Sequence, residues 1–457
     1  MAMASPSVTL HSSSTIIPSH PTPHRTLTLS ESDQAMLEGY IFIIYVYKKA
    51  FDIDASSLTI DSMRNSLSQI LVPYYPLAGR LRWIDGGRLE IDCCGAGVQL
   101  SEAEASADAK FDDYGDFEPS DATRQLVPKP DYRAPIEDQP LVLVQVTRFS
   151  CGGVVIGIAV SHFVVDGISV ITFINSWASI ARGEKTVESI IPKWPNHERD
   201  FLRPVLDPLH FHHQEYESPP LLIGHSCVEE ERNKQTTVAL LKLTKHQHEK
   251  LKKIANEGSS MLRPYTRFEA VGGHIWACAC KARNSTTTCE SDQPTAALIT
   301  ASIRQRIRPP PPEGFCGNAT LLTVTPICKF GDLIKNPLSY AAGKIREGTW
   351  KLTDEYIKSA ISFLASREIE WIKEWYRTKA TPFWGNPNLD LGCWTLMPLY
   401  DADFGWGRPS YVGPIPLVVD DGWSIIMTGP DDGSLAVVIC LQTKHMDEFK
   451  KLFYQYL

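Results

Sequence analysis

The sequence predicts an α/β (α+β) fold divided into two halves, on three observations. Runs of β-branched residues and amphipathic helical patterns occur in both halves, so sheets and helices are expected to pack together throughout. The chain has 457 residues, about three times a typical domain of roughly 150 residues, which allows two large domains or three small ones. Residues 190–217 carry four prolines and four histidines without a hydrophobic period and are expected to link the halves.

The first half contains one helical pattern, then two strands and a second helix. Residues 59–71 place their apolar side chains on one helical stripe, which ends before two closely spaced prolines. Residues 141–147 and 154–160 are β-branched runs on either side of a Cys-Gly-Gly turn and are expected to be neighbouring strands. Residues 168–181 then predict a helix that a glycine closes.

The second half repeats this mixture of elements. Thr353 is expected to cap a helix, because its hydroxyl can accept a hydrogen bond from a first-turn amide. Asp354 and Glu355 would complement the dipole of the same helix. The other predicted elements are a strand at 236–242, a helix through Leu251 and Ile254, a buried helix at 268–283, strands at 424–427 and 435–441, and a final helix holding Met446, Phe449, Leu452, Phe453 and Tyr456.

Composition narrows the classes of function. Apolar residues make up 43% and charged residues 21% of the chain, as in an ordinary globular protein, and no run of about 18 apolar residues predicts a membrane span. The net charge of -8 argues against nucleic acid or an anionic membrane as the main partner. Eleven cysteines without a spacing framework, and an N-terminus without an apolar signal core, predict free thiols and a cytoplasmic protein.

The candidate catalytic segment is residues 161–167, which read SHFVVDG and directly follow a predicted strand. If the segment is extended, the four residues from His162 to Asp166 span roughly 13 Å, too far for a hydrogen bond between the two side chains. We therefore expect Asp166 to hold the loop and His162 to act alone, because an imidazole titrates at about pH 6.5 and suits proton removal at neutral pH. Gly167 is expected where the backbone turns or a ligand approaches closely. A packed or surface histidine without a chemical role is the alternative.

A second motif, DFGWG at residues 403–407, lies near the C-terminus. HxxxDG at 162–167 followed by DFGWG resembles the plant BAHD acyl-CoA-dependent acyltransferases. Three further stretches are similar to that family in the same order, namely YPLAGR at 75–80, HIW at 274–276, and GN at 317–318, the end of the family's YFGN motif. The chain departs from the family pattern at Phe315-Cys316, at Gly392-Cys393-Trp394, where hydroxycinnamoyl enzymes often have Thr-Ser-Trp, and at Arg408, where Lys is common elsewhere.

The resemblance implies two similar chloramphenicol-acetyltransferase-like domains, each a mixed β-sheet with helices, joined by a long crossover loop. The positions of the two motifs favour domains at 1–190 and 218–457, with 191–217 as the crossover linker. The family uses a coenzyme A thioester as co-substrate, so no permanent cofactor or metal is expected. Histidines 210, 212 and 213 with Glu215 look like metal ligands, but they lie in the linker without a partner cluster.

The resemblance also implies roles for residues of the second half. Asp403 is expected to pair with Arg304, while Gly405 and Gly407 form a tight structural loop around the indole between them. Trp394 stands where relatives line the acceptor pocket, and the missing threonine beside it leaves the acceptor open.

Acyl transfer makes further demands on the site. The attacking amine or hydroxyl must lose a proton, which His162 would take. The tetrahedral oxyanion needs a donor, for which the indole N–H of Trp406 is the candidate. Coenzyme A brings phosphates, for which Arg263 and Arg267 are the candidate ligands, with an ordinary solvated surface as the alternative.

Three stretches, at 29–34, 148–153 and 278–283, look closest to the spermidine hydroxycinnamoyl transferases of the family. The shikimate enzymes carry an acid-binding arginine just before Pro-Asn-Leu, whereas here Gly385-Asn386 precede it. An amine acceptor such as spermidine is therefore expected, in a monomer that binds small molecules. The alternatives are O-acylation of shikimate, quinate or another alcohol, and a non-catalytic binding protein with this fold.

Overall fold

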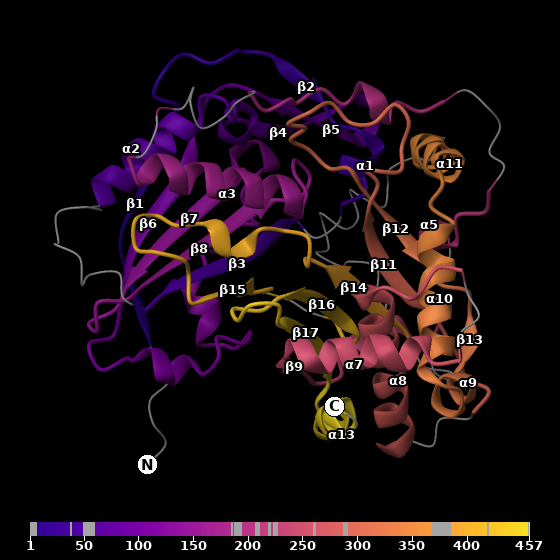
Figure 1. The fold of residues 1–457 in the computed structure, drawn as a ribbon. Coiled ribbons are helices and arrows are strands. Elements are labelled where there is room, and N and C mark those ends of the chain that lie inside the picture. The colour runs from indigo at the N-terminus through magenta and orange to yellow at the C-terminus, as the bar shows by residue number, and fades with distance from the viewer. Residues whose placement is uncertain are drawn as a thin grey trace.

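The two halves of the chain lie side by side as two mixed α/β units (Figure 1), which confirms the predicted class. The computed structural model describes residues 7–36, 39–48, 60–183, 186, 194–205, 211–217, 221–222, 227–258, 262–286, 291–366, 385–417, 420–455 and 457. Every predicted helix and strand overlaps an element of matching type, although the predicted range 141–147 begins one residue early and the range 59–71, whose first residue lies outside the described residues, ends one residue late. Tyr456, expected on the final helix, lies outside the described residues.

A six-stranded sheet with the order β1-β6-β7-β8-β3-β15 organises the N-terminal half. All eight residues of β3 and all eight of β8 are buried, and the two strands pair antiparallel from Tyr40 opposite Ser161 to Tyr47 opposite Val154. Helices α2 (Ile60–Ile70) and α3 (Gly167–Ala181) lie together over one face of this sheet (Figure 1). The strands are β1 (Val8–Ile16), β3 (Tyr40–Tyr47), β6 (Val98–Ala105), β7 (Val142–Arg148), β8 (Val154–Ser161) and β15 (Tyr411–Pro414).

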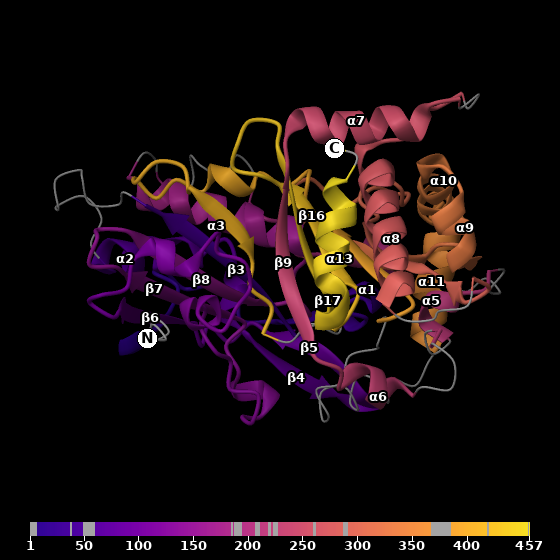
Figure 2. The ribbon, with the colours of Figure 1, turned by 90° about the horizontal axis from the view of Figure 1, so that it is seen from below.

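A second six-stranded sheet, with the order β12-β11-β14-β16-β17-β9, organises the C-terminal half. Helix α8 (Arg267–Thr286) packs mainly against α7 (Lys245–Asn256), α10 (Leu338–Trp350) and α13 (Thr443–Tyr454), as the underside view shows (Figure 2). A Cβ on Gly273 would lie 2.8 Å from the backbone N of Ala342, so glycine allows α8 and α10 to approach closely. The strands are β9 (Thr236–Leu243), β11 (Ala297–Ser302), β12 (Thr320–Val324), β14 (Leu389–Cys393), β16 (Trp423–Thr428) and β17 (Leu435–Gln442).

Short elements connect and extend these sheets. A three-stranded sheet has the order β2-β5-β4, and β10 pairs with β13. Thr353 caps α11 as predicted, since its Oγ1 accepts from the backbone N of Tyr356 at 3.3 Å. These elements are α1 (Glu31–Gln34), β2 (Thr26–Thr28), β4 (Arg80–Ile84), β5 (Arg88–Asp92), α5 (Gln214–Glu217), α6 (Val228–Arg232), β10 (Pro294–Thr295), β13 (Cys328–Lys329), α9 (Phe330–Lys335) and α11 (Asp354–Ser366).

The division between the halves is not strict, because the C-terminal half supplies a strand to the N-terminal sheet. After β14 the chain crosses over, and β15 pairs antiparallel with β3, with Tyr411 opposite Val46 (Figure 1). On the way, Phe404 is fully buried in the N-terminal core, with its ring 4.8 Å from that of Trp177 in a T-shaped contact. A boundary between 217 and 218 therefore separates the two sheets in all but this strand.

We predict that Phe404→Ala lowers the free energy of unfolding by about 3–5 kcal/mol, because it leaves a cavity where the two halves interdigitate. The denaturant midpoint, followed by tryptophan fluorescence and circular dichroism, measures this change. Leu262→Ala removes an exposed leucine and serves as the control, with a change of at most about 0.5 kcal/mol. Equal midpoints for the two variants would show that Phe404 does not join the halves.

Candidate active site

His162 lies on the loop that joins β8 to α3, and main-chain contacts hold it there. Its backbone N donates to the carbonyl of Gly39 at 2.8 Å, and its own carbonyl accepts from Asn318 Nδ2 at 2.7 Å. The side chain is half-buried, and its Nδ1 atom is buried without a hydrogen-bond partner among the described residues. Because Nδ1 is buried, only the exposed part of this residue can meet a substrate.

Asp166 ends this loop and begins α3, where it serves as the helix N-cap. Its Oδ1 accepts from the backbone N of Ser169 at 3.0 Å and from Arg304 Nη2 at 2.9 Å. Its Oδ2 accepts from Arg304 Nη1 and from the backbone N of Ala319. Burial alone would raise the pKa of Asp166, but the charge of Arg304 and these donors lower it overall. The carboxylate holds the loop, as predicted, and its partners are these groups rather than His162.

The predicted partner of Asp403 is wrong, because Arg304 binds Asp166 instead. Arg304 follows β11 and reaches the first turn of α3. Asp403 lies at the other end of that helix, where Arg182, the C-cap residue, donates to its carbonyl at 2.8 Å. A helix of 15 residues is about 22 Å long, so one arginine cannot serve both carboxylates.

The DFGWG motif forms the tight loop that its two glycines predict. Oδ1 of Asp403 accepts from the backbone N of Gly405 at 2.7 Å and from that of Gly407 at 2.9 Å. Gly405 has a φ of 99° and Gly407 a φ of 80°, both in the region that favours glycine. The motif is therefore a closed structural turn.

Trp406 lies too far from His162 to act as the oxyanion donor, which corrects that prediction. Its ring contacts the ring of Tyr47, with centroids 5.3 Å apart. Tyr47 ends β3, whereas Tyr40 at the start of β3 pairs with Ser161, the residue before His162. Seven strand steps of about 3.3 Å, or roughly 23 Å, separate the two ends.

Trp394 lies on the side of the loop where α3 begins. A Cβ on Gly167 would lie 2.7 Å from Cε of Met397 and 4.0 Å from Nε1 of Trp394. The close approach that Gly167 permits is thus made by side chains of the protein's own C-terminal half. The indole N–H of Trp394 consequently lies beside the first residue of α3, five positions after His162 in the sequence.

Residues 385–386, where the shikimate enzymes carry an acid-binding arginine, precede β14. Asn386 is buried, and its backbone N donates to Asp421 Oδ2 at 3.1 Å. It precedes β14, whereas Trp394 follows the same strand, so the two lie at opposite ends of β14. The absence of an arginine before Pro387 remains a prediction from sequence in favour of an amine acceptor.

The two predicted coenzyme A ligands flank the start of α8. Arg263 and Arg267 are both exposed, and the carbonyl of Arg263 accepts from Arg346 Nη1 at 2.6 Å, which holds the segment in place. Burial raises the pKa of the Cys393 thiol at the end of β14, and the charge of Arg267 opposes that rise. The charge of Arg267 therefore lies near the end of β14, which Trp394 directly follows in the sequence.

Of the four candidate metal ligands in the linker, His213 and Glu215 are buried and His212 is exposed. His213 Nε2 lies 2.9 Å from Ser359 Oγ on α11, so the two buried residues are not surface decoration. His210 lies outside the described residues. Within the described ranges no group of three or more His, Cys, Asp or Glu side chains could hold a metal ion. Over the same ranges ten cysteines carry free thiols, and no helix is long and apolar enough to cross a membrane.

Arg199 and Asn318, which contact the His162 loop, and Asp33, which binds both of them, were absent from the predicted site. Asp33 and Asn318 lie in stretches that resemble the family, at 29–34 and 317–318. Asp33 is separated from Arg199 and Asn318 by 166 and 285 residues in the sequence, which gives no sign that they meet. A motif can mark such residues, but only the fold shows their contacts.

The model of the "Transferase family" matches residues 6–456, nearly the whole chain. The chain belongs to this family. It is an acyl-CoA-dependent acyltransferase of the BAHD type, as the order of its motifs predicts.

Several relatives of this BAHD acyltransferase carry hydroxycinnamoyl in their names. The hydroxycinnamoyl-CoA:piscidic acid hydroxycinnamoyltransferase of Actaea racemosa is 43% identical over 98% of this chain and 99% of its own length. The shikimate O-hydroxycinnamoyltransferase of Nicotiana tabacum is 35% identical over 97% of this chain and 98% of its own. A hydroxycinnamoyl-CoA:5-hydroxyanthranilate N-hydroxycinnamoyltransferase of Avena sativa is 33% identical over 98% of this chain and 100% of its own.

Solved structures share the two-domain fold. Vinorine synthase superposes with a TM-score of 0.70 at 21% identity, covering 97% of this chain and 96% of that one. F. graminearum TRI101 in complex with coenzyme A and T-2 mycotoxin superposes with a TM-score of 0.73 at 14% identity, covering 93% of this chain and 97% of that one. Identities this low establish the fold alone.

We predict that Asp166→Asn destabilises the protein at neutral pH and that this loss shrinks as the pH falls below about 4. The pKa of Asp166 is lower in the folded chain than in the unfolded chain. The ionised group therefore stabilises the fold above the unfolded value, and this is lost as the pH falls through the folded value. Melting temperatures of both proteins between pH 3 and 7 measure the difference. Asp121→Asn, an exposed carboxylate, is the control with a constant difference; a constant difference for Asp166→Asn would contradict the prediction.

Proposed function

We propose that this acyltransferase moves a hydroxycinnamoyl group from its coenzyme A thioester to a small acceptor, with His162 as general base. The observation that carries the proposal is the position of His162: the residue is partly exposed, and its main chain is held by Gly39 from one half and by Asn318 from the other. The names of relatives 33–43% identical over nearly the full chain support the acyl group. The proposed enzyme is a cytoplasmic monomer that holds no permanent cofactor.

The chemistry follows from what a thioester needs. The acyl carbon is already activated, so the acceptor attacks it directly as the imidazole of His162 removes the acceptor's proton. The tetrahedral intermediate collapses with cleavage of the carbon–sulfur bond. The imidazolium then protonates the departing thiolate, which yields free coenzyme A and returns His162 to its neutral state. Asp166, paired with Arg304, holds the loop and takes no proton.

The oxyanion of that intermediate needs a donor, and Trp394 is better placed than Trp406. The indole N–H of Trp394 lies beside Gly167 at the start of α3, whereas Trp406 lies near Tyr47 at the far end of β3. An N–H already aimed at developing negative charge stabilises a transition state strongly because it needs no reorganisation. We assign this role to Trp394, which also borders the acceptor side. Arg263 and Arg267 are proposed to bind the phosphates of coenzyme A.

Two acceptor classes are proposed. An amine such as spermidine is favoured by the three stretches similar to the spermidine enzymes, and the net charge of -8 is compatible with a cationic acceptor. A hydroxy acid is favoured by the 43% identical relative named for piscidic acid and by the shikimate enzyme. The sequence and the names of the relatives thus point to different acceptor classes, and an assay must decide between them.

We predict that His162→Ala lowers kcat by about 10²–10⁴-fold, because the acceptor then attacks without a positioned base. Purified protein assayed for free thiol release from coumaroyl-CoA measures the change. His246→Ala, at an exposed position on α7, is the control and retains full turnover. Full turnover in His162→Ala would exclude the proposed base.

We predict that the purified protein acylates spermidine with coumaroyl-CoA or caffeoyl-CoA. Parallel reactions with spermidine, shikimate and piscidic acid, each analysed by mass spectrometry, identify the acceptor. A product with the acids but not with spermidine would replace the amine assignment by the hydroxy acid. An absence of product from either donor with all three acceptors would contradict the proposed activity.

A further inference from the structure

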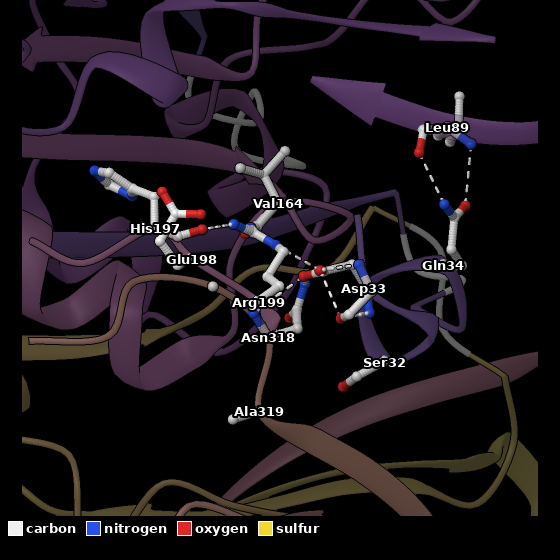
Figure 3. Close-up of polar contacts among 12 residues, drawn as sticks. Ser32, Asp33, Gln34, Leu89, Val164, His197, Glu198, Arg199, Asn318 and Ala319 are labelled. Atoms are coloured by element: carbon white, nitrogen blue, oxygen red, sulfur yellow. Dashed lines mark hydrogen bonds and ion pairs between the residues drawn. The ribbon is translucent and has the colours of Figure 1, made fainter. Parts of the chain in front are cut away.

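Asp33, Arg199 and Asn318 form a buried polar cluster (Figure 3). The cluster contacts the main-chain carbonyls of His162 and Val164. The three residues come from α1, from the linker and from the segment before β12. The side chain of Asp33 is fully buried and that of Arg199 is 6% exposed. Charged side chains are rarely buried this deeply unless they are paired, so the arrangement calls for a reason.

Asn318 contacts the catalytic histidine through the main chain. One amide Nδ2 group donates both to the carbonyl of His162 at 2.7 Å and to Asp33 Oδ1 at 2.9 Å. The backbone N of Asn318 also donates to Asp33 Oδ1 at 3.1 Å. Asp33 thus fixes the amide orientation that presents a donor to His162.

Arg199 holds the same loop two residues further on. Its Nη2 donates to the carbonyl of Val164 at 3.0 Å, while its Nε donates to Asp33 Oδ2 at 2.7 Å. Its Nη1 donates to the carbonyl of His197 within the linker at 2.6 Å. The carbonyls of residues 162 and 164 are therefore both held by side chains that Asp33 orients.

Helix α1 keeps Asp33 itself in place. Ser30 caps the helix, and both its backbone N and its Oγ donate to Asp33 Oδ2, at 2.8 and 2.7 Å. Ser32 Oγ donates to the carbonyl of Thr320 at 2.6 Å. Gln34 bonds both backbone groups of Leu89, as Figure 3 shows. All four residues of α1 are buried polar residues, so this helix anchors a network rather than a hydrophobic core.

We propose that Asp33, Arg199 and Asn318 are positioning residues that set the direction in which His162 projects its imidazole. A rotation of the peptide groups at 162 or 164 would break buried hydrogen bonds, so the loop keeps one conformation. Such restraint raises the rate because a displacement of about 1 Å at a reacting group costs up to about 10²-fold. The inference rests on the proposed function of His162. Through Arg199, the linker would then contribute a positioning residue to the site as well as joining the two halves.

The test begins with Asn318→Ala, which removes the donor to His162 without altering a charge. We expect kcat to fall about tenfold or more, while KM for the acyl-CoA and for the acceptor stays within about twofold. Asp421→Asn is the matched control, because Asp421 forms a buried pair with Arg283 at 3.2 Å in the C-terminal half. That control is expected to lower the melting temperature and keep the kcat of the folded protein.

A second pair of variants separates positioning from folding. Asp33→Asn leaves the charge of Arg199 buried without its partner, whereas the double variant Asp33→Asn, Arg199→Gln removes both charges. We expect the double variant to regain part of the lost melting temperature while its kcat stays low. A kcat that recovers together with the melting temperature would overturn the positioning role.

His162→Ala, assayed in parallel, separates a failure of the proposed general base from a failure of the positioning role. Loss of turnover in His162→Ala with wild-type kcat in folded Asn318→Ala would overturn the positioning role alone. Full turnover in His162→Ala would overturn the proposed base and the positioning role together. Circular dichroism and melting temperatures establish the folded fraction to which each kcat is referred.

Discussion

The paired contact between Asp166 and Arg304 is the interaction on which the site depends. It joins the loop after β8 to the segment that follows β11, and so connects the two halves of the chain near His162. Arg304 Nη2 also donates to the carbonyl of Gly317 at 3.3 Å, and its guanidinium lies 5.6 Å from the ring centre of Phe315. Removing one member of a buried ion pair commonly costs about 3–5 kcal/mol, because the other charge stays buried. The halves are thus locked together where the chemistry is proposed.

Each end of helix α3 contacts one of the two family motifs. Its N-terminus is capped by Asp166 of the first motif, and Arg182 at its C-terminus holds Asp403 of the second. The C-terminal half therefore contacts both ends of a helix that belongs to the N-terminal half. The strand pairing of β15 with β3 completes this arrangement, since it adds backbone hydrogen bonds between the halves. These contacts between the halves explain why the structural turn at residues 403–407, though far from His162, accompanies the HxxxDG motif.

The linker takes part in the site as well as joining the halves. His197 is buried, with its Nε2 3.0 Å from the carbonyl of Pro73 and its ring against Tyr75 of the YPLAGR stretch. Burial lowers the pKa of His197 to about 4, so it is neutral at physiological pH and fits this packed position. Two residues later, Arg199 reaches Asp33 and the His162 loop. One short segment thus connects the YPLAGR stretch to the candidate active site.

The class of fold and nearly all of its elements could be predicted from the sequence. Helical stripes, β-branched runs and caps such as Thr353 are local signals, because hydrophobic period and capping act within one or two turns. The expectation that His162 and Asp166 do not bond agrees with the partners of Asp166. Its premise of an extended segment is wrong, because residues 162–164 form a turn in which the backbone N of Val164 donates to the carbonyl of Ser161 at 3.1 Å. Motif order then indicated the family that the whole-chain comparison established.

The contacts between residues far apart in the sequence could not be predicted and were found only in the three-dimensional structure. Arg304 was assigned to Asp403, and Trp406 to the oxyanion, because sequence order does not show that these groups lie at opposite ends of α3 and β3. Asn318 and Arg199 went without a role for the same reason, since their hydrogen bonds to residues 162 and 164 span 156 and 35 positions. A buried polar contact depends on position in space, and long-range pairing of strands and linker sets that position.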